Sequence, residues 1–330
     1  RATLLGLLPD HPELEPLDAD MRHLLASWFN RGFLELRRID WHTPAAILEK
    51  LIAYEAVHAI DGWDDLRGRL GGDRRCYGFF HPALPEEPLI FIEVALTDSI
   101  SDAMATIRNM GKETGLYDSY IRTDYTWLTK GPTGANGKNL TKFDALVFVS
   151  TTGEMDLTDA QKKDLLSYVH DDGKGFVGVH AALDANYNWP EYGEMIGGWF
   201  DEHPWNTFDA PIIREDATFP ATRHFPANFV KNDEIYQAKA WSRDKVNVLL
   251  RLDETKLKID GNKRVKRADR DFAVAWAKMY GKGRVFYSTL GHTNESWSDP
   301  AVKTMYLEAI KWALGLTEGS TETHPRRPAQ

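Results

Sequence analysis

Polar side chains that can transfer protons follow three apolar, strand-like runs in the larger, C-terminal part of the chain, at residues 147–149, 176–179 and 285–290. The side chains shortly after these runs are hydroxyls, imidazoles and carboxylates, namely Thr151, Thr152, His180, Asp184, His292 and Glu295. Because ligands bind at the carboxyl ends of strands in an open parallel sheet, we expect these residues to line one cleft. Histidine titrates near neutral pH, so the pattern predicts general acid–base chemistry.

Two further residues are candidates for the same cleft. His203 lies near the end of a Gly- and aromatic-rich segment, and Glu234 could orient an imidazole or act as a base. The predicted catalytic residues are therefore His180, Asp184, His203, Glu234 and His292. Three histidines and a carboxylate could also bind a divalent metal, but the ligands would come from distant loops. The spacing therefore assigns no metal ligand, and each histidine alone could equally be a hydrogen-bonded structural residue.

Aromatic and hydroxyl side chains near these positions could bind a sugar. Tyr187 and Trp189 could form a platform for a pyranose ring, or they could pack in the core. Thr151 and Thr152 could bind hydroxyls or an anion, or they could form only a tight turn. Together with Glu295 they are the predicted substrate-binding residues, and the predicted partner is a small-molecule carbohydrate.

Composition excludes several classes of partner. The chain has 330 residues, a formal net charge of -9 and a pI of about 5.7. An acidic surface repels phosphate backbones, so nucleic acid is not expected. No apolar run approaches the ~20 residues of a membrane span, so no membrane partner is expected. Cys76 is the only cysteine, which excludes an internal disulfide and fits a reducing, cytoplasmic location.

The elements that must position these residues alternate between helix and strand. Helices are predicted over residues 102–113, 158–170 and 300–313. The second begins with a Thr158–Gln161 capping box and the third with Asp299 as its cap. Strands are predicted at residues 145–150, 176–180, 210–214, 233–238, 247–252, 272–279 and 284–290. This order predicts a mostly parallel sheet covered on both faces. Residues 263–270 are expected to form a solvated loop and residues 318–330 a disordered tail.

The N-terminal part follows a different pattern. Helices are predicted near residues 21–28, 43–60 and 61–70, and two strand-like runs follow at residues 74–80 and 89–96. This part is therefore expected to be a helical fragment followed by a pair of strands.

Five motifs stand out in the larger part of the chain. They are FDALVFVSTTGE at residues 143–154, GFVGVHAALD at 175–184, YGEMIGGWFDEHP at 192–204, DEIY at 233–236 and GRVFYSTLGHTNE at 283–295. As a set, over about residues 99–317, they resemble the ThuA-like (trehalose-utilisation) family. The resemblance implies a flavodoxin-like α/β fold related to class I glutamine amidotransferases. It also implies a role in handling trehalose or related glycosides, as a hydrolase or a lyase on an oxidised sugar.

The amidotransferase relatives implied by this resemblance carry a nucleophilic cysteine on a sharp turn after the equivalent strand. That position is His180 here, and Cys76 lies far away in the sequence. A thiolate mechanism is therefore not expected, and acid–base or metal-assisted chemistry remains.

Three segments of the N-terminal part carry a second resemblance. They are WFNRGFLELRRIDWHTPAAILEKLIAYEAVHA at residues 28–59, WDDLRGRL at 63–70 and RRCYGFFHPALPEEPLIFIEVALT at 74–97. Over about residues 20–98 the chain resembles malonyl-CoA decarboxylase. The catalytic serine and histidine of that family lie further along, in segments that this chain lacks, so decarboxylase activity is not expected.

The two resemblances together predict a chimera. Residues 1–98 would be a decarboxylase-like fragment and residues 99–317 a ThuA-like domain. ThuA-like chains normally open with their own buried strand, and residues 89–96 could take its place. Glu93 would then be paired or near the sheet edge, because an unpaired buried carboxylate is costly.

The leading functional prediction is an enzyme of carbohydrate metabolism that acts on a trehalose-type glycoside or a keto-sugar. The alternatives are an inactive malonyl-CoA decarboxylase fragment and a non-catalytic sugar-binding module. A bound sugar recovered unchanged would favour the module. A rate that depends on pH in the histidine range would favour the enzyme.

Overall fold

The computed structural model describes residues 89–94, 99–134 and 137–326, and for residues 89–94 it describes the backbone only. These residues all belong to one compact unit that begins at Glu86. The helices and the strand predicted within residues 1–88 lie outside the described residues, and so does Cys76. Those predictions stay predictions.

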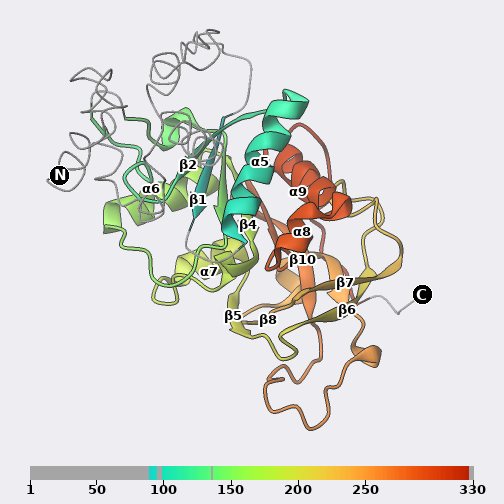
Figure 1. The fold of residues 1–330 in the computed structure, drawn as a ribbon. Helices are drawn as coiled ribbons and strands as arrows, with labels where there is room; N and C mark the ends of the chain where they lie inside the picture. The colour runs from blue at the N-terminus through green and yellow to red at the C-terminus, as the bar shows by residue number, and fades with distance from the viewer. Residues whose placement is uncertain (1–88, 95–98, 135–136, 327–330) are drawn as a thin grey trace, which may run out of the picture. The chain divides into compact units, whose positions relative to one another are not determined.

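One half of the central sheet is parallel. Its strands lie in the order β2, β1, β3, β4 and β11, which is the flavodoxin-like order when β11 is counted as the fifth strand (Figure 1). Their bounds are Leu89–Val94 (β1), Asp118–Arg122 (β2), Ala145–Val149 (β3), Gly175–Val179 (β4) and Gly283–Ser288 (β11). Every residue of β3 and β4 is buried, which explains why both read as continuous apolar runs.

The other half of the sheet is antiparallel. It continues from β11 through β10 and β9 to β6 and β7, with bounds Ala273–Tyr280 (β10), Asn247–Leu252 (β9), Thr207–Arg214 (β6) and Asn228–Glu234 (β7). A separate pair joins β5 (Trp199–Glu202) to β8 (Gln237–Lys239). The α/β fold is confirmed. Within the large sheet, only β2, β1, β3, β4 and β11 run parallel to one another.

The strand predicted over residues 233–238 is wrong, because the chain leaves the large sheet after Glu234 and enters the small one at Gln237. The side chain of Thr289 accounts for the break. Its hydroxyl donates to the Glu234 carbonyl and accepts from the Tyr236 N–H, each at 3.2 Å. A side chain thus replaces the strand ladder at this point, and Glu234 becomes a strand-end residue.

Helices cover both faces of the sheet (Figure 1). Helices α5 (Ile100–Thr114), α8 (Asn294–Ser298) and α9 (Pro300–Ala313) pack together on one face, and α6 (Asp159–His170) and α7 (Pro190–Ile196) lie on the other. The predicted capping box of Thr158 and Gln161 is present at α6, and Asp299 caps α9. Short 3-10 turns occupy Leu140–Lys142 (η4), His180–Leu183 (η5), Arg243–Lys245 (η6) and Glu254–Lys256 (η7).

Strand β1 lies between β2 and β3, parallel to both. Ile92 is level with Ile121 on one side and with Val147 on the other. The run at residues 89–96 therefore supplies a central strand of the sheet over Leu89–Val94, as the chimera hypothesis required. The structure does not describe the Glu93 side chain, so the pairing expected for it stays a prediction.

The tail predicted to be disordered is ordered as far as Arg326. The Asn247 side chain donates to the Ser320 carbonyl at 2.8 Å, and His324 Nε2 lies 3.0 Å from the Val248 carbonyl. These contacts with β9 hold the tail in place. The polar composition of the tail gave no sign of them, because the partners lie more than seventy residues away in the sequence.

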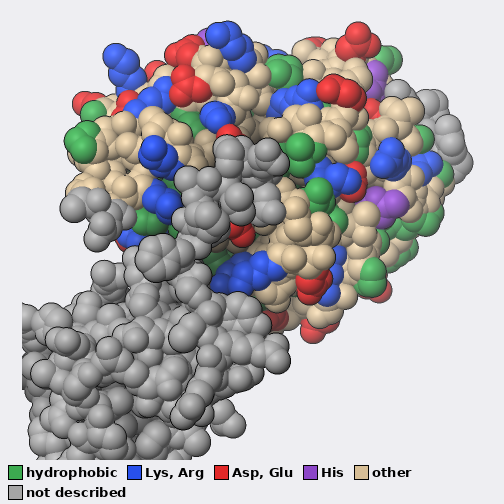
Figure 2. Space-filling model, turned by 90° about the horizontal axis from the view of Figure 1, so that it is seen from above, with side chains coloured by type: hydrophobic (Ala, Val, Ile, Leu, Met, Phe, Trp, Pro, Cys, Tyr) green, Lys and Arg blue, Asp and Glu red, His purple; other side chains and the backbone are tan. Residues whose placement is uncertain are grey.

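None of the described helices is both long enough and apolar enough to span a membrane. On the face shown in Figure 2, acidic and basic side chains are interspersed.

Asp216, directly after β6 and Glu215, is a buried carboxylate held by hydrogen bonds. It accepts from the backbone N–H groups of Thr218 and Phe219 at 2.8 and 3.1 Å, and from Asn247 Nδ2 at 3.0 Å. Burial would raise the pKa of Asp216, but these hydrogen bonds outweigh it and hold the pKa below its ordinary value of 3.8.

Asp216 therefore stabilises the fold above its ordinary pKa, and this contribution disappears as the pH falls through its lower folded pKa. We expect the Asp216→Asn variant to unfold more easily than the unmodified chain near neutral pH. The difference in unfolding free energy should shrink below about pH 4. Urea denaturation between about pH 3 and 7 measures it, and a difference that stays constant down to the acid end would contradict the prediction.

Candidate functional site

His180 is the buried centre of the site. It directly follows β4, and its backbone is in the left-handed region, with φ of 45°. This conformation is strained for a residue with a side chain, and it turns the chain sharply into η5. His180 Nδ1 lies 2.6 Å from the Thr289 carbonyl, which can only accept. Nδ1 therefore carries a proton. In the neutral ring Nε2 presents a lone pair to the site, and in the protonated ring it can donate toward Glu234.

Glu234 reaches the same point from the end of β7. Its Oε2 lies 3.5 Å from His180 Nε2, and its Oε1 lies 3.1 Å from His203 Nδ1. Burial would raise the pKa of Glu234, but the His180 hydrogen bond and the charges of the surrounding imidazoles outweigh it and lower the pKa. The site therefore holds a carboxylate anion beneath three imidazoles.

His292 completes the central group from the loop after β11. Its Nδ1 lies 3.1 Å from His180 Nε2 and 3.5 Å from Glu234 Oε2. The His292 side chain is 40% exposed, whereas those of His180 and Glu234 are 2% and 11% exposed. The structure thus brings together three of the predicted residues from β4, β7 and β11, with His292 at the solvent side.

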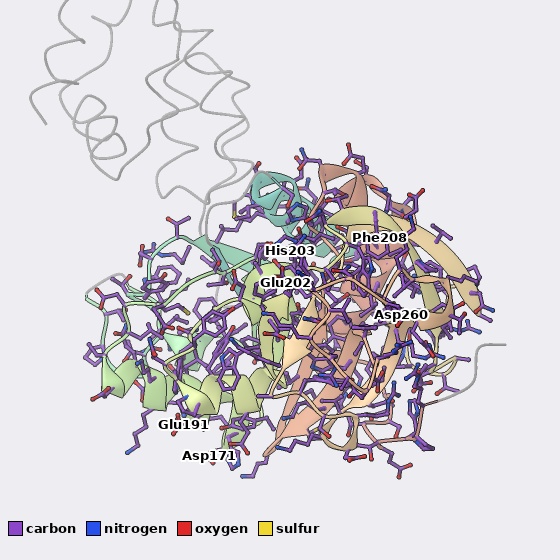
Figure 3. All side chains as sticks on the ribbon, turned by 90° about the horizontal axis from the view of Figure 1, so that it is seen from below. Asp171, Glu191, Glu202, His203, Phe208 and Asp260 are labelled. Atoms are coloured by element: carbon purple, nitrogen blue, oxygen red, sulfur yellow. The ribbon has the colours of Figure 1, made fainter. Side chains whose placement is uncertain are left out.

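His203 lies beside this group at the end of β5. Its ring stacks on Phe200, and Arg264 Nη2 lies 3.0 Å from the same Nδ1 that approaches Glu234. Glu202 is next to it and receives a hydrogen bond from Arg264, which lowers the pKa of Glu202. Figure 3 shows His203 and Glu202 next to each other near the middle of the view, with Asp171 and Glu191 at its lower edge.

Asp233 holds the loop that carries His292. Its buried carboxylate accepts from the N–H groups of Gly291 and His292 at 2.8 and 3.1 Å, and from the Ser296 hydroxyl at 2.6 Å. These three bonds fix the loop between β11 and α8. Asp233 is therefore a positioning residue for His292.

Asp184 does not join the central group. Its carboxylate accepts hydrogen bonds from the Thr152 and Tyr187 hydroxyls. The Tyr187 hydroxyl oxygen also lies 3.3 Å from the Phe200 carbonyl oxygen, so this second cluster borders the stack of Phe200 on His203. Asp184 is placed to hold the rim of the site.

The other predicted binding residues differ in accessibility. Trp189 is 5% exposed and packs against Tyr192 in the core, so its position matches core packing better than a sugar platform. Thr151 is fully buried, and its hydroxyl has no hydrogen-bond partner among the described residues. Tyr187 and Glu295 are exposed.

Sequence reasoning missed the residues that support the site. Asp233 stands next to Glu234 in the DEIY motif, so its position was a usable signal. Arg264 belongs to residues 263–270, expected to be a solvated loop, yet it contacts His203 and Glu202. The sequence of that loop does not predict this contact, because the contact depends on the position of β5 relative to the loop in the folded chain.

Comparisons with protein families divide the chain as the two resemblances do. The model for ThuA, trehalose utilisation, matches residues 89–313. The models for the N-terminal and C-terminal domains of malonyl-CoA decarboxylase match residues 1–29 and 32–120. The decarboxylase match therefore begins before residue 20 and extends beyond residue 98, and the two families overlap over residues 89–120.

Curated relatives match the N-terminal part. Mitochondrial malonyl-CoA decarboxylase from Anser anser anser is 43% identical over 98 residues, which are 30% of this chain and 19% of that protein. The protein of the same name from Rattus norvegicus is 39% identical over 100 residues, 30% of this chain and 20% of that protein. The chain thus spans about a fifth of the length of these relatives.

Solved structures match the larger part. A ThuA-like protein from Bacteroides uniformis has a TM-score of 0.55 and 22% identity, and the match covers 69% of this chain and 92% of that one. A ThuA-like protein from Parabacteroides merdae has a TM-score of 0.53 and 15% identity, with coverage of 73% and 93%. These similarities show a shared fold.

Proposed function

Because the chain belongs to the ThuA, trehalose-utilisation, family, we propose that it is an enzyme that acts on a glycoside or a keto-sugar by proton transfer. The substrate class comes from the family description. The chemistry comes from the site, where a buried carboxylate lies among three imidazoles. Hydrolysis and elimination of a glycoside both need a group that removes a proton and a group that returns one to the leaving oxygen.

The observation that carries the proposal is the pair of partners at His203 Nδ1. Glu234 Oε1 lies 3.1 Å and Arg264 Nη2 lies 3.0 Å from this nitrogen. The carboxylate can only accept and the guanidinium can only donate. Arg264 Nη2 also lies 3.4 Å from His203 Nε2, so a carboxylate and a guanidinium both contact the imidazole that we propose transfers the proton. The His203 side chain is 32% exposed, which leaves it open to a substrate.

The surrounding residues divide the remaining work. The buried carboxylate of Glu234 contacts all three imidazoles and holds them in place. His180 is buried with it, while His292 lies at the solvent side. The aromatic rings of Phe200 and Tyr236 pack against His203 and His180, and they limit the access of water to the imidazoles. Asp184 and Tyr187 at the rim offer hydrogen bonds to sugar hydroxyls.

Replacing His203 with alanine should lower kcat/KM for a keto-glycoside by about 10²–10⁴-fold, because a positioned proton donor contributes that much. The full chain would be incubated with trehalose, a 3-keto-glucoside and malonyl-CoA, and the products followed by NMR spectroscopy. His170→Ala is the matched control, because His170 pairs with Asp171 away from His203 and is exposed.

Three results of this assay would overturn the proposal. A sugar that binds and is recovered unchanged would indicate a binding module. Turnover of malonyl-CoA alone would assign the activity to the N-terminal part. Equal losses in the His203 and His170 variants would remove the role of His203.

A further inference from the structure

Three atoms at the centre of the site form a small triangle. His180 Nε2 lies 3.1 Å from His292 Nδ1, and Glu234 Oε2 lies 3.5 Å from each nitrogen. A tetrahedral zinc ion bound at about 2.0–2.2 Å separates its ligand atoms by about 3.3–3.6 Å. The observed spacing matches this geometry. We propose that His180, Glu234 and His292 together bind one divalent transition-metal ion of the Zn²⁺ type.

The protonation of His180 fits a metal ligand. Its Nδ1 proton is committed to the Thr289 carbonyl at 2.6 Å, so in the neutral ring, which is the form that binds a metal, the Nε2 lone pair faces His292. Two nitrogen lone pairs at this separation repel each other unless a proton or a cation lies between them. A cation satisfies both nitrogens and the carboxylate at once, whereas a single shared proton leaves Glu234 Oε2 3.5 Å from either ring.

Each of the three residues is held by a partner outside the triangle. The Thr289 carbonyl orients His180, and His203 Nδ1 lies 3.1 Å from the other oxygen of Glu234. Asp233 accepts from the backbone N–H of His292 at 3.1 Å. Metal ligands are generally oriented by such outer contacts, which fix both the ring tautomer and the carboxylate. The triangle is therefore pre-organised by contacts that do not use its three facing atoms.

The ligand set and its exposure indicate a reactive type of site. Two imidazoles and one carboxylate suit Zn²⁺ and its transition-metal neighbours, whereas Mg²⁺ and Ca²⁺ prefer oxygen ligands. Three protein ligands leave one tetrahedral position for water or a substrate. Because His292 is 40% exposed, that position can face solvent.

The ion would add a Lewis acid to the proposed enzyme. It could polarise the carbonyl of a keto-sugar, while His203 stays outside the triangle and remains able to transfer a proton. This catalytic use rests on the proposed function. The binding of the ion does not, and it can be measured without a sugar.

The test is metal binding by the full chain after removal of any affinity tag and of bound metal. Zn²⁺ would be titrated by calorimetry and Co²⁺ by visible absorption. We expect about one ion per chain, and a rise in Tm of about 5–10 °C when Zn²⁺ is at 100 times its Kd. Mg²⁺ should produce no comparable shift.

Variants separate the ligands from their surroundings. His180→Ala and His292→Ala should each weaken Zn²⁺ binding by more than about 100-fold, and His203→Ala by about 10–100-fold. His170→Ala should bind as the unmodified chain does. If the buried His180 variant fails to fold, the half-exposed His292 variant still tests the site.

Absence of saturable Zn²⁺ and Co²⁺ binding would overturn the metal site and leave a hydrogen-bonded histidine pair. Unchanged affinity in the His292 variant, or a preference for Mg²⁺, would also overturn it. Zinc binding without sugar conversion would support the metal site and count against the proposed function. Sugar conversion by a chain that binds no metal would do the reverse.

Discussion

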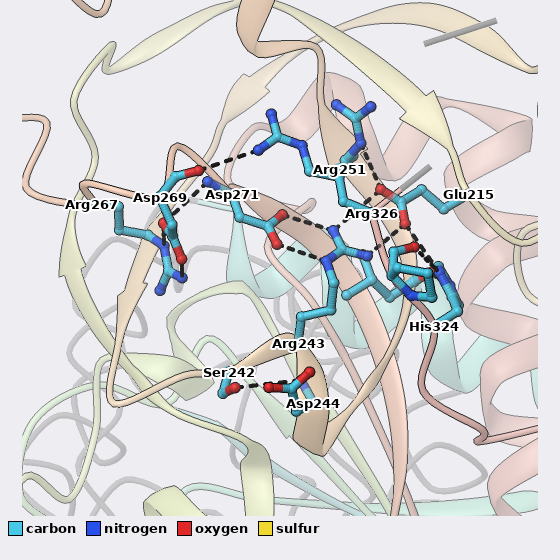
Figure 4. Close-up of polar contacts among 12 residues, drawn as sticks. Glu215, Ser242, Arg243, Asp244, Arg251, Arg267, Asp269, Asp271, His324 and Arg326 are labelled. Carbon is cyan, nitrogen blue, oxygen red and sulfur yellow. Dashed lines mark hydrogen bonds and ion pairs between the residues drawn. The ribbon is translucent and has the colours of Figure 1, made fainter. Parts of the chain in front are cut away.

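Replacing Glu215 with alanine should lower the free energy of unfolding by about 3 kcal/mol, because it removes one partner from a buried group of ions. The Glu215 side chain is fully buried and pairs with Arg243 Nη1 at 2.6 Å and Arg251 Nε at 2.5 Å (Figure 4). The Arg251 side chain is itself only 2% exposed. Alanine would leave two guanidinium charges facing a small cavity, and water could not replace the lost carboxylate without entering the core.

The loss should lie at the lower end of the range for a broken buried pair, about 3–5 kcal/mol, because each arginine keeps another carboxylate. Arg243 forms two bonds of 2.7 Å to Asp271, and Arg251 forms one of 2.6 Å to Glu254. Urea denaturation at neutral pH measures the change.

Glu318→Ala is the matched control for Glu215. The Glu318 side chain is 87% exposed and pairs with Arg284, so its removal should cost less than about 1 kcal/mol. Glu215 follows the last residue of β6, whereas Glu234 pairs with the first residue of that strand, so the network and the histidine cluster lie at opposite ends of β6. The folded Glu215 variant should therefore keep its metal binding. Equal destabilisation by the two variants would contradict the structural account.

Replacing Asp233 with alanine should both destabilise the fold and disable the site. Four donors would lose this acceptor, namely the N–H groups of Glu234, Gly291 and His292 and the Ser296 hydroxyl. A buried donor without a partner costs about 1–3 kcal/mol, so we expect a loss of at least about 3 kcal/mol. The loop would also release His292, and Zn²⁺ binding should weaken by about 10–100-fold in the protein that remains folded.

Two variants make the Asp233 prediction specific. Asp233→Asn keeps one acceptor oxygen but places an amide donor against other donors, so it should rescue only part of the stability and of the metal affinity. Asp209→Ala removes an exposed carboxylate that bonds Asn232, and it should change stability by less than about 0.5 kcal/mol. Lost stability with unchanged metal affinity would show that Asp233 does not position His292.

Local signals in the chain were sufficient to predict most elements of the larger part. The capping box of Thr158 and Gln161 and the Asp299 cap are complete within a few residues, so α6 and α9 begin where they were expected. The apolar runs that became β3 and β4 need no knowledge of their neighbours, because both faces of each strand are buried. Errors arose where a distant side chain decides the outcome, as when Thr289 ends β7.

The residue types of the site were predictable for the same reason. His180 and His292 follow parallel strands, and the carboxyl ends of parallel strands meet at one edge of a sheet. Glu234 comes instead from the antiparallel half, so its approach to His180 depends on the order of four further strands. Asp184 follows the same strand as His180, yet η5 turns it toward Thr152 and Tyr187.

The sequence alone determined that this chain joins two families, that its larger part is an α/β domain and that histidines gather at one edge of its sheet. These properties depend on short motifs and on the burial of apolar runs. Only the tertiary structure decided which side chains meet. The triangle of His180, Glu234 and His292, the support from Asp233 and the contact of Arg264 with His203 all join residues more than fifty positions apart. Such contacts are set by strand order and by turns, and the spacing along the chain does not encode them directly.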